Sequence, residues 1–466
     1  MKYPQALSHE VFDYLKQCST LLGLRAYVVG GYVRDFLLEI PSKDIDVVVE
    51  GKGIEFAKKF AELVNAKEVA WYENFGTAMV RYQDIIIEFV GARKESYQRN
   101  SRKPIVEEGT LLDDQLRRDF TINALSISLN AEDFGELYDP FQGLDDLKKG
   151  IIRTPTNPDI TFSDDPLRMM RAVRFATRFQ FQIEEKTYQA LKDNKHRIDI
   201  ISKERIAEEF NKMMMATKPS QGYKYLFDTG LLALIFPELH KMQGVDFIDG
   251  KGHKDKFYHT LKVLDNVVEK SESLWLRWVA IFHDIGKPAT KRYEKENGWT
   301  FHGHEDKGAR MVPDIFKKMK FPLNEKMKYV QKLTALHQRP IALVNEEVSD
   351  SAIRRLVVDA GEDLDDLLLF CRCDITSGIP EKVKRILGKY DVLAARIKAV
   401  EERDQLRNWQ PPISGEMIME FYQIKPSKTV GNIKNAIREA ILDGIIGNDY
   451  ESAVSFMREI APKYLS

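Results

Sequence analysis

Cysteine is scarce in this sequence, with 3 residues among 466, namely Cys18, Cys371 and Cys373. An odd and sparse set argues against a disulfide framework and favours a reducing compartment. A single arginine separates Cys371 from Cys373. This spacing is too short for a zinc knuckle, so we expect buried thiols at both positions.

Long hydrophobic runs are also missing. The longest, such as IIIEFV and LLALIF, are far shorter than the roughly 20 apolar residues that a membrane-spanning helix needs. The N-terminal segment MKYPQALSHE lacks the apolar core of a secretory signal peptide. We therefore expect a cytoplasmic protein without a membrane partner.

Neither sign of charge is in excess, because the net charge is −1. Binding to nucleic acid would therefore depend on local basic patches and not on an overall basic field. Hydrophobic residues make up 43% and charged residues 30% of the chain, which is ordinary for a soluble globular protein. A chain of 466 residues is too long for one compact domain, so we expect about two to four.

The segment from Tyr27 to Val49 places two carboxylates close to a glycine pair. An apolar run leads into Gly30-Gly31 and a helical YVRDFLLE, and KDIDVVV follows after a turn. Residues two apart in a strand share a face, so Asp44 and Asp46 lie side by side while their apolar neighbours face the core. Two such carboxylates repel one another unless a cation lies between them, and hard oxygen ligands suit Mg²⁺.

A glycine pair at a helix N-terminus leaves backbone N–H groups open to a phosphate. Beside a metal-binding carboxylate pair, this pattern indicates phosphoryl or nucleotidyl transfer. The alternative is a surface hairpin with a solvated DxD, because that motif alone is a weak pattern.

A third carboxylate is predicted beside this pair. The segments TAMVRY and DIIIEFVGAR have the spacing of strands, and Glu88 would project away from its apolar neighbours Ile87 and Phe89. It would complete a two-metal site, although a solvent-facing glutamate on an amphipathic strand is an equal alternative. The polar residues 93–118 then predict a mobile loop that leads into a helix.

The segment RRDFTINALSISL carries four candidate ligands for a nucleotide. On a helix, Asp119 and Asn123 would be one turn apart and share a face. Arginine side chains such as Arg117 and Arg118 suit triphosphate oxygens, and a carboxylate can accept a hydrogen bond from a ribose hydroxyl.

Helical periodicity replaces strand patterns after residue 150. The segment SDDPLRMMRAVRFATRF predicts a helix with Ser163 as its N-cap and Pro166 in its first turn. Asp165 and Arg168 would then share a face and read a base edge. Cytosine and adenine offer an amine beside a ring acceptor, whereas uracil and guanine place a carbonyl there that Asp165 would repel. A surface ion pair between these residues is the alternative.

The neighbouring segment ISKERIAEEFNKMM predicts another helix, starting at Ser202. Arg205 and Glu209 would form an i,i+4 pair in it, which we interpret as structural. Basic residues outnumber acidic ones from Arg168 to Lys212, and this excess suits an RNA backbone.

A second group of candidate ligands begins near residue 250. Imidazole and carboxylate ligands from several helices are how helical folds build metal sites. Lys287 is a candidate phosphate contact beside them, and the region from about residue 380 is helical without recognisable chemistry. The predicted metal ligands are His259, His283, Asp284, His304, His337 and Asp374.

Six segments resemble class II tRNA nucleotidyltransferases, the family of the CCA-adding enzymes and bacterial poly(A) polymerase. They occur in that family's order and spacing as GGYVRD, KDIDVVV, RRDFTINALS, DPFQGLDDL, DDPLRMMRAVRF and KERIAEEFNK. The histidine and aspartate set resembles an HD-domain phosphohydrolase, a domain that some bacterial CCA-adding enzymes carry. The resemblance covers roughly residues 25 to 380.

The resemblance implies an α+β fold, with a small mixed-sheet head followed by helical neck, body and tail. The expected divisions are an N-terminal helix at 1–26, a nucleotidyltransferase head at 27–150, a neck at 151–245, an HD domain at 246–380 and a tail at 381–466.

The resemblance also implies roles for the candidate residues. Asp44 and Asp46 would hold the catalytic Mg²⁺ ions, with Glu88 as the third candidate carboxylate, and the HD ligands would hold a second divalent metal. The family's Glu-Asp pair is replaced here by Asp164-Asp165, which leaves Asp165 in the base-reading position. The implied nucleotide-binding residues are Gly30, Gly31, Arg34, Arg117, Arg118, Asp119, Asn123, Asp165, Arg168, Arg171 and Arg174.

The activity implied is template-independent addition of CCA to the tRNA 3′ end from CTP and ATP. Poly(A) polymerases typically carry a GRRF-type stretch after the DxD, where this chain has EGKGIEFAKKF. Relatives that add only CC lack part of a flexible loop that is intact here around residues 93–112. Addition of C alone or A alone stays open. An HD phosphohydrolase with an RNA-binding head and a non-catalytic RNA-binding protein are the alternatives of another class.

Overall fold

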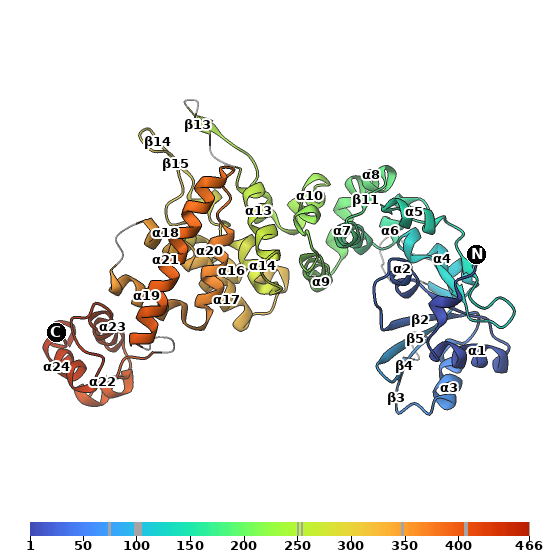
Figure 1. Ribbon diagram of the computed structural model, residues 1–466, viewed down its shortest axis with the longest axis horizontal. Helices are drawn as coiled ribbons and strands as arrows, with labels where there is room; N and C mark the ends of the chain where they lie inside the picture. Colours follow the sequence, from blue (N-terminus) through green and yellow to red (C-terminus); the bar gives the residue numbers. More distant parts are fainter. Residues whose placement is uncertain are drawn as a thin grey trace. The chain divides into compact units, whose positions relative to one another are not determined.

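The computed structural model describes residues 1–72, 76–96, 105–248, 251–252, 255–345, 349–404 and 409–465. The chain divides into two compact units, Met1–His240 and Lys241–Ser466. The first unit contains a mixed sheet with helices, and the second is almost entirely helical (Figure 1). The predicted α+β class is therefore confirmed.

A seven-stranded sheet forms the core of the first unit, in the order β3-β4-β5-β2-β1-β8-β9. The pair β2–β5 is parallel, and the other adjacent pairs are antiparallel. Its strands are β1 (Ala26–Val29), β2 (Asp44–Val49), β3 (Glu68–Tyr72), β4 (Thr77–Tyr82), β5 (Ile85–Gly91), β8 (Ser126–Ser128) and β9 (Leu137–Tyr138).

One face of the sheet is buried by α1 (Val11–Leu22) and α3 (Gly53–Leu63), which lie beside the strands in Figure 1. Alternation along β2 sends Ile45 and Val47 into this core and Asp46 to the other face, as the period-2 pattern predicted. Leu21 of α1 points away from this core and is 56% exposed.

The other face carries a smaller apolar cluster of Tyr27, Val29, Val48, Ala92 and Leu111. Leu111 begins α4 (Leu111–Leu116), whose capping box at Thr110 fixes where the helix starts. The polar region predicted as a loop before this helix contains paired strands β6 (Arg93–Ser96) and β7 (Ile105–Glu108) in its described part. Residues 97–104, within that prediction, lie outside the described residues.

The neck predicted after residue 150 is helical, but one predicted helix start is wrong. Ser163 lies in the last turn of α6 (Pro158–Asp164), and α7 (Leu167–Phe179) begins only after Pro166, its N-cap. Asp165 has an extended backbone, with φ of −131° and ψ of 96°. The residue before a proline is disfavoured in the helical region, so the chain breaks into two helices here.

The other helices of the first unit, with its two short strands, are α2 (Gly31–Leu37), α5 (Gly143–Lys149), β10 (Ile151–Ile152), β11 (Gln182–Ile183), α8 (Glu185–Asn194), α9 (Lys203–Met214), α10 (Ser220–Asp228), α11 (Leu231–Ile235) and α12 (Pro237–His240). Ser202 is the N-cap of α9 as predicted.

The second unit is a helical body with two small hairpins. Among the described residues, no helix is both long and apolar enough to cross a membrane. Its elements are β12 (Phe247–Ile248), β13 (Lys251–Gly252), α13 (Lys256–Val268), α14 (Leu274–Phe282), α15 (Lys287–Thr290), β14 (Arg292–Glu294), β15 (Gly298–Thr300), α16 (His304–Met319), α17 (Glu325–Leu336), α18 (Gln338–Asn345), α19 (Asp350–Ala360), α20 (Leu364–Cys373), α21 (Pro380–Asp404), α22 (Gly415–Tyr422), α23 (Lys428–Leu442), α24 (Tyr450–Ile460) and α25 (Pro462–Leu465).

The last helices of this unit form a separate apolar cluster, in which Ile418, Ile433, Ile437 and Met457 are buried. Their connection to α19 is strongly charged. Arg355 of α19 pairs with Glu439 and Asp443 at 2.9 and 2.6 Å, and Arg438 of α23 pairs with Asp359.

Candidate active site and metal centre

The predicted carboxylates lie together on the face of the sheet opposite α1 and α3. Asp46 and Glu88 are direct partners across the parallel pair β2–β5, and Asp44 is two residues before Asp46. Burial raises the pKa of Asp46. The charge of nearby Arg118 lowers this pKa in part, and the charge of Asp44 raises it further. Burial and Asp46 likewise raise the pKa of Glu88. A divalent cation would relieve this repulsion, and the hard oxygen donors fit one.

The glycine pair lies at the end of β1, beside these carboxylates. Gly30 has a φ of +67°, a backbone conformation that residues with a side chain rarely adopt. A Cβ at this position would lie 2.7 Å from Arg118 Nη1. Its N–H donates to the Leu125 carbonyl at 3.1 Å. The predicted open N–H is therefore wrong for Gly30, and what its lack of a side chain provides is close approach of an arginine.

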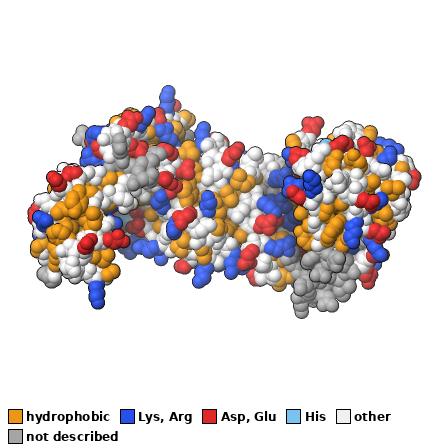
Figure 2. All heavy atoms as spheres, turned by 90° about the horizontal axis from the view of Figure 1, so that it is seen from below, with side chains coloured by type: hydrophobic (Ala, Val, Ile, Leu, Met, Phe, Trp, Pro, Cys, Tyr) orange, Lys and Arg blue, Asp and Glu red, His pale blue; other side chains and the backbone are white. Residues whose placement is uncertain are grey.

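An arginine-rich cavity of about 440 Å³ opens between the glycine pair and α7. All eleven predicted nucleotide-binding residues line it together with Asp46, whereas Asp44 and Glu88 are not among its lining residues. Figure 2 shows Lys and Arg side chains gathered in the region of the neck helices beside the head. Its arginines are Arg34, Arg117, Arg118, Arg168, Arg171, Arg174, Arg178 and Arg205.

The sequence prediction missed three lining residues, Phe175, Arg178 and Arg205. The first two follow Arg171 by four and seven positions on α7, so helical periodicity alone was a usable signal. Arg205 was interpreted as the structural partner of Glu209. Glu209 instead accepts from Arg174 Nε at 2.5 Å, in a buried pair, and Arg205 faces the cavity.

Asp114, which carried no sequence prediction, is a fully buried carboxylate that holds two of these arginines. It accepts from Arg118 Nε and Nη2 at 2.9 and 2.8 Å, and from Arg117 Nε at 3.0 Å. Burial raises the pKa of Asp114, but the two guanidinium groups lower it by more than burial raises it, so this pKa lies below its ordinary value. Asp114 is therefore charged at neutral pH and orients both arginine side chains.

Asp119 and Asn123 form the predicted pair, but without the predicted α-helix. A short 3₁₀ helix at Thr121–Asn123 follows an extended Phe120, and Asn123 Nδ2 donates to Asp119 Oδ1 at 2.9 Å. Asp119 also accepts from Arg171 at 2.6 Å, and Asn123 accepts from Arg34 at 2.6 Å. Arg171 and Asn123 overcome the effect of burial, so the pKa of Asp119 is lowered. One network thus joins α2, the 3₁₀ helix and α7.

Asp165 and Arg168 line the same cavity, although Asp165 precedes the helix that carries Arg168. Asp165 Oδ1 accepts from the Leu167 N–H at 3.2 Å, and Arg168 Nη2 donates to the Arg117 carbonyl at 2.5 Å. The backbone turn at Pro166, and not a shared helix face, brings the two side chains together.

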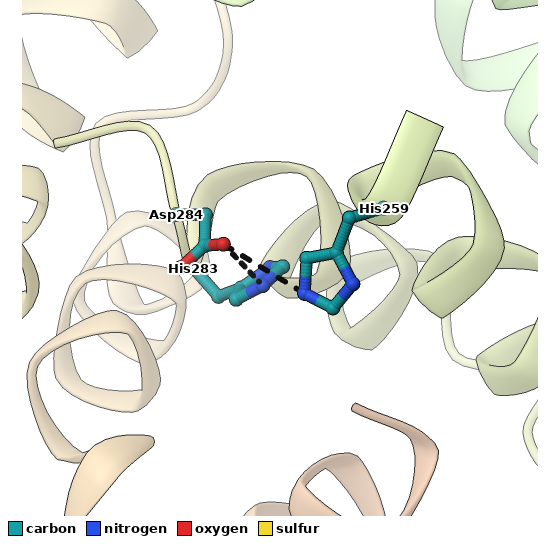
Figure 3. A group of neighbouring side chains, drawn as sticks. All are labelled: His259, His283 and Asp284. Atoms are coloured by element: carbon teal, nitrogen blue, oxygen red, sulfur yellow. Dashed lines mark ion pairs between the residues drawn. The ribbon is translucent and has the colours of Figure 1, made fainter. Parts of the chain in front are cut away.

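The second unit brings the predicted metal ligands together from separate helices. His259 is on α13, and His283-Asp284 follows α14. His304 begins α16, His337 follows α17 and Asp374 follows α20. Figure 3 shows His259, His283 and Asp284 pointing toward one another. The His283 and His259 Nε2 atoms lie 3.4 and 3.7 Å from Asp284 Oδ2.

Asp284 belongs to two groups of possible ligands, one with His259 and His283 and the other with His304 and His337. Within each group, the ligand atoms lie within 4.8 Å of one another. Three of these imidazoles have Nδ1 next to a backbone carbonyl, at 2.8 Å for His283, 2.9 Å for His304 and 2.7 Å for His337. Because a carbonyl only accepts, Nδ1 is the donor in each ring and Nε2 points inward, where it is an acceptor whenever the ring is neutral, as a metal-bound ring is.

In this arrangement, imidazole Nε2 atoms and carboxylate oxygens, all hydrogen-bond acceptors, face one another. His304 Nε2 lies 3.3 Å from His337 Nε2, and burial with the nearby His283 lowers the pKa of His337 to about 3. His283 Nε2, Asp284 Oδ1 and Asp374 Oδ1 are buried without a hydrogen-bond partner. Inward-facing lone pairs of this kind are what divalent metal ions bind, so the residues present fit a metal centre. The predicted phosphate contact Lys287 pairs with Asp284 Oδ2 at 2.7 Å.

Three family models match the chain in succession. A poly A polymerase head domain matches residues 26–153, and a probable RNA and SrmB-binding site of polymerase A matches residues 180–243. An HD domain matches residues 257–367.

Among curated proteins, the chain is 31% identical over 362 residues to the multifunctional CCA protein of Laribacter hongkongensis, covering 75% of this chain and 84% of that protein. It is 28% identical to the A-adding tRNA nucleotidyltransferase of Deinococcus radiodurans over 93% of this chain and 95% of that one. A 47% match to the A-adding enzyme of Aquifex aeolicus covers 36% of this chain and spans 20% of that protein. A 39% match to a CCA-adding enzyme of Ligilactobacillus salivarius covers 45% of this chain and 50% of that enzyme.

Solved structures share the fold. A CCA-adding enzyme in complex with ATP aligns with a TM-score of 0.62 at 23% identity, covering 100% of this chain and 96% of that one. A tRNA nucleotidyltransferase complexed with a primer tRNA and an incoming ATP analog aligns with a TM-score of 0.57 at 25% identity, covering 82% of this chain and 98% of that one.

Proposed function

This chain belongs to the tRNA nucleotidyltransferase family, and we propose that its first unit adds CCA to the 3′ end of tRNA from CTP and ATP. The observation that carries the proposal is the cavity in which Asp46 meets Asp165 and eight arginines, one of which is Arg168 of the base-reading pair. Guanidinium groups in this number suit a triphosphate. The three unpaired, buried cysteines suit a reducing cytoplasm.

Asp44, Asp46 and Glu88 are the residues that would hold Mg²⁺. When bound, the metal supplies activation of the RNA 3′-hydroxyl and neutralisation of charge on the leaving pyrophosphate. The protein's own contribution is to position the reactants. Arg118, held by Asp114 and packed against Gly30, would orient the triphosphate beside Asp46.

Selection of the base is assigned to Asp165 and Arg168. Asp165 would accept the exocyclic amine of cytosine or adenine, and Arg168 would donate to the adjacent ring nitrogen. A carbonyl in place of the amine, as in uracil or guanine, would leave the Asp165 carboxylate facing an acceptor, which is strongly disfavoured. This recognition explains how one cavity accepts both nucleotides without a template strand.

The relatives include both A-adding and CCA-adding proteins, so specificity is the first property to test. The protein is incubated with tRNA lacking its 3′ end, Mg²⁺, and labelled CTP and ATP separately and together. CCA addition requires two C and then one A, followed by a stop. Addition of A alone, and only to tRNA already ending in CC, identifies an A-adding enzyme, and an unlimited A tail identifies a poly(A) polymerase.

Replacement of Asp46 by alanine tests the catalytic site itself. We expect incorporation to be abolished while the far-UV spectrum and tRNA binding are retained, because charge stabilisation provides most of the catalysis. Normal extension by this variant would refute the assignment.

We also propose that the second unit hydrolyses a phosphate ester, and that its two ligand groups, His259 with His283 and His304 with His337, each together with Asp284, would hold one divalent cation each. The supporting observation is that two ligand groups share this one carboxylate. Shared carboxylates are typical of two-metal sites for phosphoryl chemistry. Lys287, adjacent to Asp284, would contact the substrate phosphate. Hydrolysis of p-nitrophenyl phosphate and bis-p-nitrophenyl phosphate with added divalent metals tests this activity and separates monoesterase from diesterase.

A further inference from the structure

A second cavity of the first unit, with a volume of about 580 Å³, lies at the carboxyl end of β5. It is bounded by the start of α3, the turn before β4 and the base of the β6–β7 hairpin. Its lining combines apolar and charged groups and includes Ile54, Lys58, Gly76, Val90, Arg93 and Glu107. Cavities of about 300–1,000 Å³ hold small organic ligands, so a nucleotide fits its size.

This cavity begins two residues beyond Glu88 along β5. In the sheet, Asp46 of β2 lies opposite Glu88 of β5, and Glu88 lies opposite Met79 of β4. Val90, which lines the cavity, follows Glu88 by two residues and so shares its face, about 7 Å further along the strand. The cavity therefore lies at the edge of the sheet, where Val90 of the carboxylate face meets the start of α3, which packs on the opposite face.

The order of the strands determines from which side the RNA 3′-hydroxyl must approach the carboxylates. The arginine-rich cavity lies on the β1 side of β2, because Gly30 follows β1 and Asn123 precedes β8. Nucleotidyl transfer needs the attacking and leaving oxygens roughly in line on opposite sides of the phosphorus. With the triphosphate on the β1 side, the attacking 3′-hydroxyl has to arrive from the side of β5 and β4.

The side chains on that side are exposed and suited to nucleobases. Met79 is 37% exposed and Tyr72 is 48% exposed. Met79 is the strand partner of Glu88, and Tyr72 is the strand partner of Thr77, two residues before Met79, so Met79 and Tyr72 lie on the face of Glu88. Aromatic side chains stack on bases without sequence preference. The cations Lys58 and Arg93 of the cavity suit phosphates, and its carboxylates, such as Glu107, suit the amine of cytosine.

We propose that the open face of β5, β4 and β3 binds the single-stranded 3′ end of the RNA primer, whose nucleotides before the terminal one enter the 580 Å³ cavity. This inference rests on the proposed nucleotidyl transfer and adds the primer's path to it. The two substrates thus reach the catalytic carboxylates from opposite edges of β2.

Kinetics of a Tyr72→Ala/Met79→Ala variant test the surface without altering a catalytic residue. Loss of one stacking platform raises KM for tRNA about tenfold, whereas KM for CTP and kcat at saturating tRNA stay unchanged. The matched control is Leu21→Ala, because Leu21 is also exposed, at 56%, but lies on α1, against the opposite face of the sheet. Thermal melting of each variant checks that the fold is intact.

Photocrosslinking supplies a second measurement that does not need turnover. A tRNA primer with 4-thiouridine just before its 3′-terminal nucleotide is irradiated on the full-length protein, and the crosslinked peptides are mapped. Crosslinks within residues 51–58 or 76–94 support the proposal.

The outcomes separate this inference from the proposed function. If the wild-type protein does not extend tRNA, the proposed function itself fails. If it extends tRNA but the double variant keeps its KM for tRNA and the crosslinks fall elsewhere, only the primer path is wrong. A raised KM for CTP with an unchanged KM for tRNA would assign the face to the free nucleotide and overturn the proposal.

Discussion

Asp114 shows how a residue outside the arginine-rich cavity can fix the side chains that line it. Its carboxylate receives two guanidinium groups and has no exposed surface. The Arg117 carbonyl in turn receives Arg168. The end of α4 therefore connects the groups assigned to the triphosphate with a group assigned to the base.

Replacement of Asp114 by asparagine should weaken binding of CTP about tenfold or more but change binding of CMP much less. The neutral amide cannot hold two guanidinium groups, and removing one partner of a buried ion pair costs about 3–5 kcal/mol. Calorimetric titration with CTP and with CMP measures the ratio.

The matched control is Asp146→Asn, because Asp146 is also buried and paired, with Arg153 at 3.1 Å and Thr121 at 2.8 Å, outside the cavity. It should lose stability while keeping the CTP-to-CMP ratio. An equal loss of both ligands in the Asp114 variant would mean that Asp114 only supports the fold.

A second residue-scale prediction concerns Asp46, whose pKa burial raises. A carboxyl with a raised folded-state pKa destabilises the fold as pH rises through that value, because the charged form is penalised only in the folded state. In EDTA at pH 7, Asp46→Asn should therefore raise Tm by roughly 2 °C. Mg²⁺ should stabilise the wild type and not the variant in differential scanning fluorimetry. A lower Tm for the variant in EDTA would contradict this.

At the scale of elements, the sequence predicted what depends on short periods and failed where tertiary contacts decide. The alternation around Asp44, Asp46 and Glu88 placed them on one sheet face correctly. The α6–α7 break was missed because the acidic run before Pro166 also looks like a helix start. Asp119 and Asn123 were paired correctly but through the wrong local structure.

The two ligand groups around Asp284 could not be predicted either. The sequence identifies six histidines and aspartates, but which ones share a carboxylate depends on how α14, α16 and α17 pack. Likewise, Arg205 could be assigned to the cavity only because the structure shows that Glu209 forms its ion pair with Arg174.

The charged contact between α19 and α23 predicts salt-dependent attachment of the last helices. Exposed ion pairs contribute about 0–1 kcal/mol each and are screened by salt. An Arg355→Ala/Arg438→Ala variant should therefore increase hydrogen–deuterium exchange in residues 428–442 at low salt. The wild type should approach this exchange at high salt.

Lys398→Ala is the control for this variant, since Lys398 pairs with Glu402 within α21 and bridges no two elements. It should leave exchange in α23 unchanged. If the double variant exchanges like the wild type at low salt, apolar contacts and not these ion pairs hold the helices.

For the whole molecule, the two proposed activities occupy separate compact units and should be separable. His337→Ala removes a ligand from only one group around Asp284, so bound metal should fall from two ions to one per chain by mass spectrometric metal analysis. Nucleotide addition to tRNA should stay within about twofold of wild type, because Asp46 and its cavity belong to the first unit. Loss of addition in this variant would show that the units are coupled.

The arginine-rich cavity has a consequence for the direction of the reaction. Its eight guanidinium groups suit phosphate charge, and the pyrophosphate that the proposed reaction releases carries much of the charge of the triphosphate consumed. Binding that is equally strong before and after the chemical step does not raise kcat. Pyrophosphate should therefore compete with CTP and ATP and drive the reverse cleavage of a finished 3′ end. Net addition then depends on removal of pyrophosphate by a separate hydrolase.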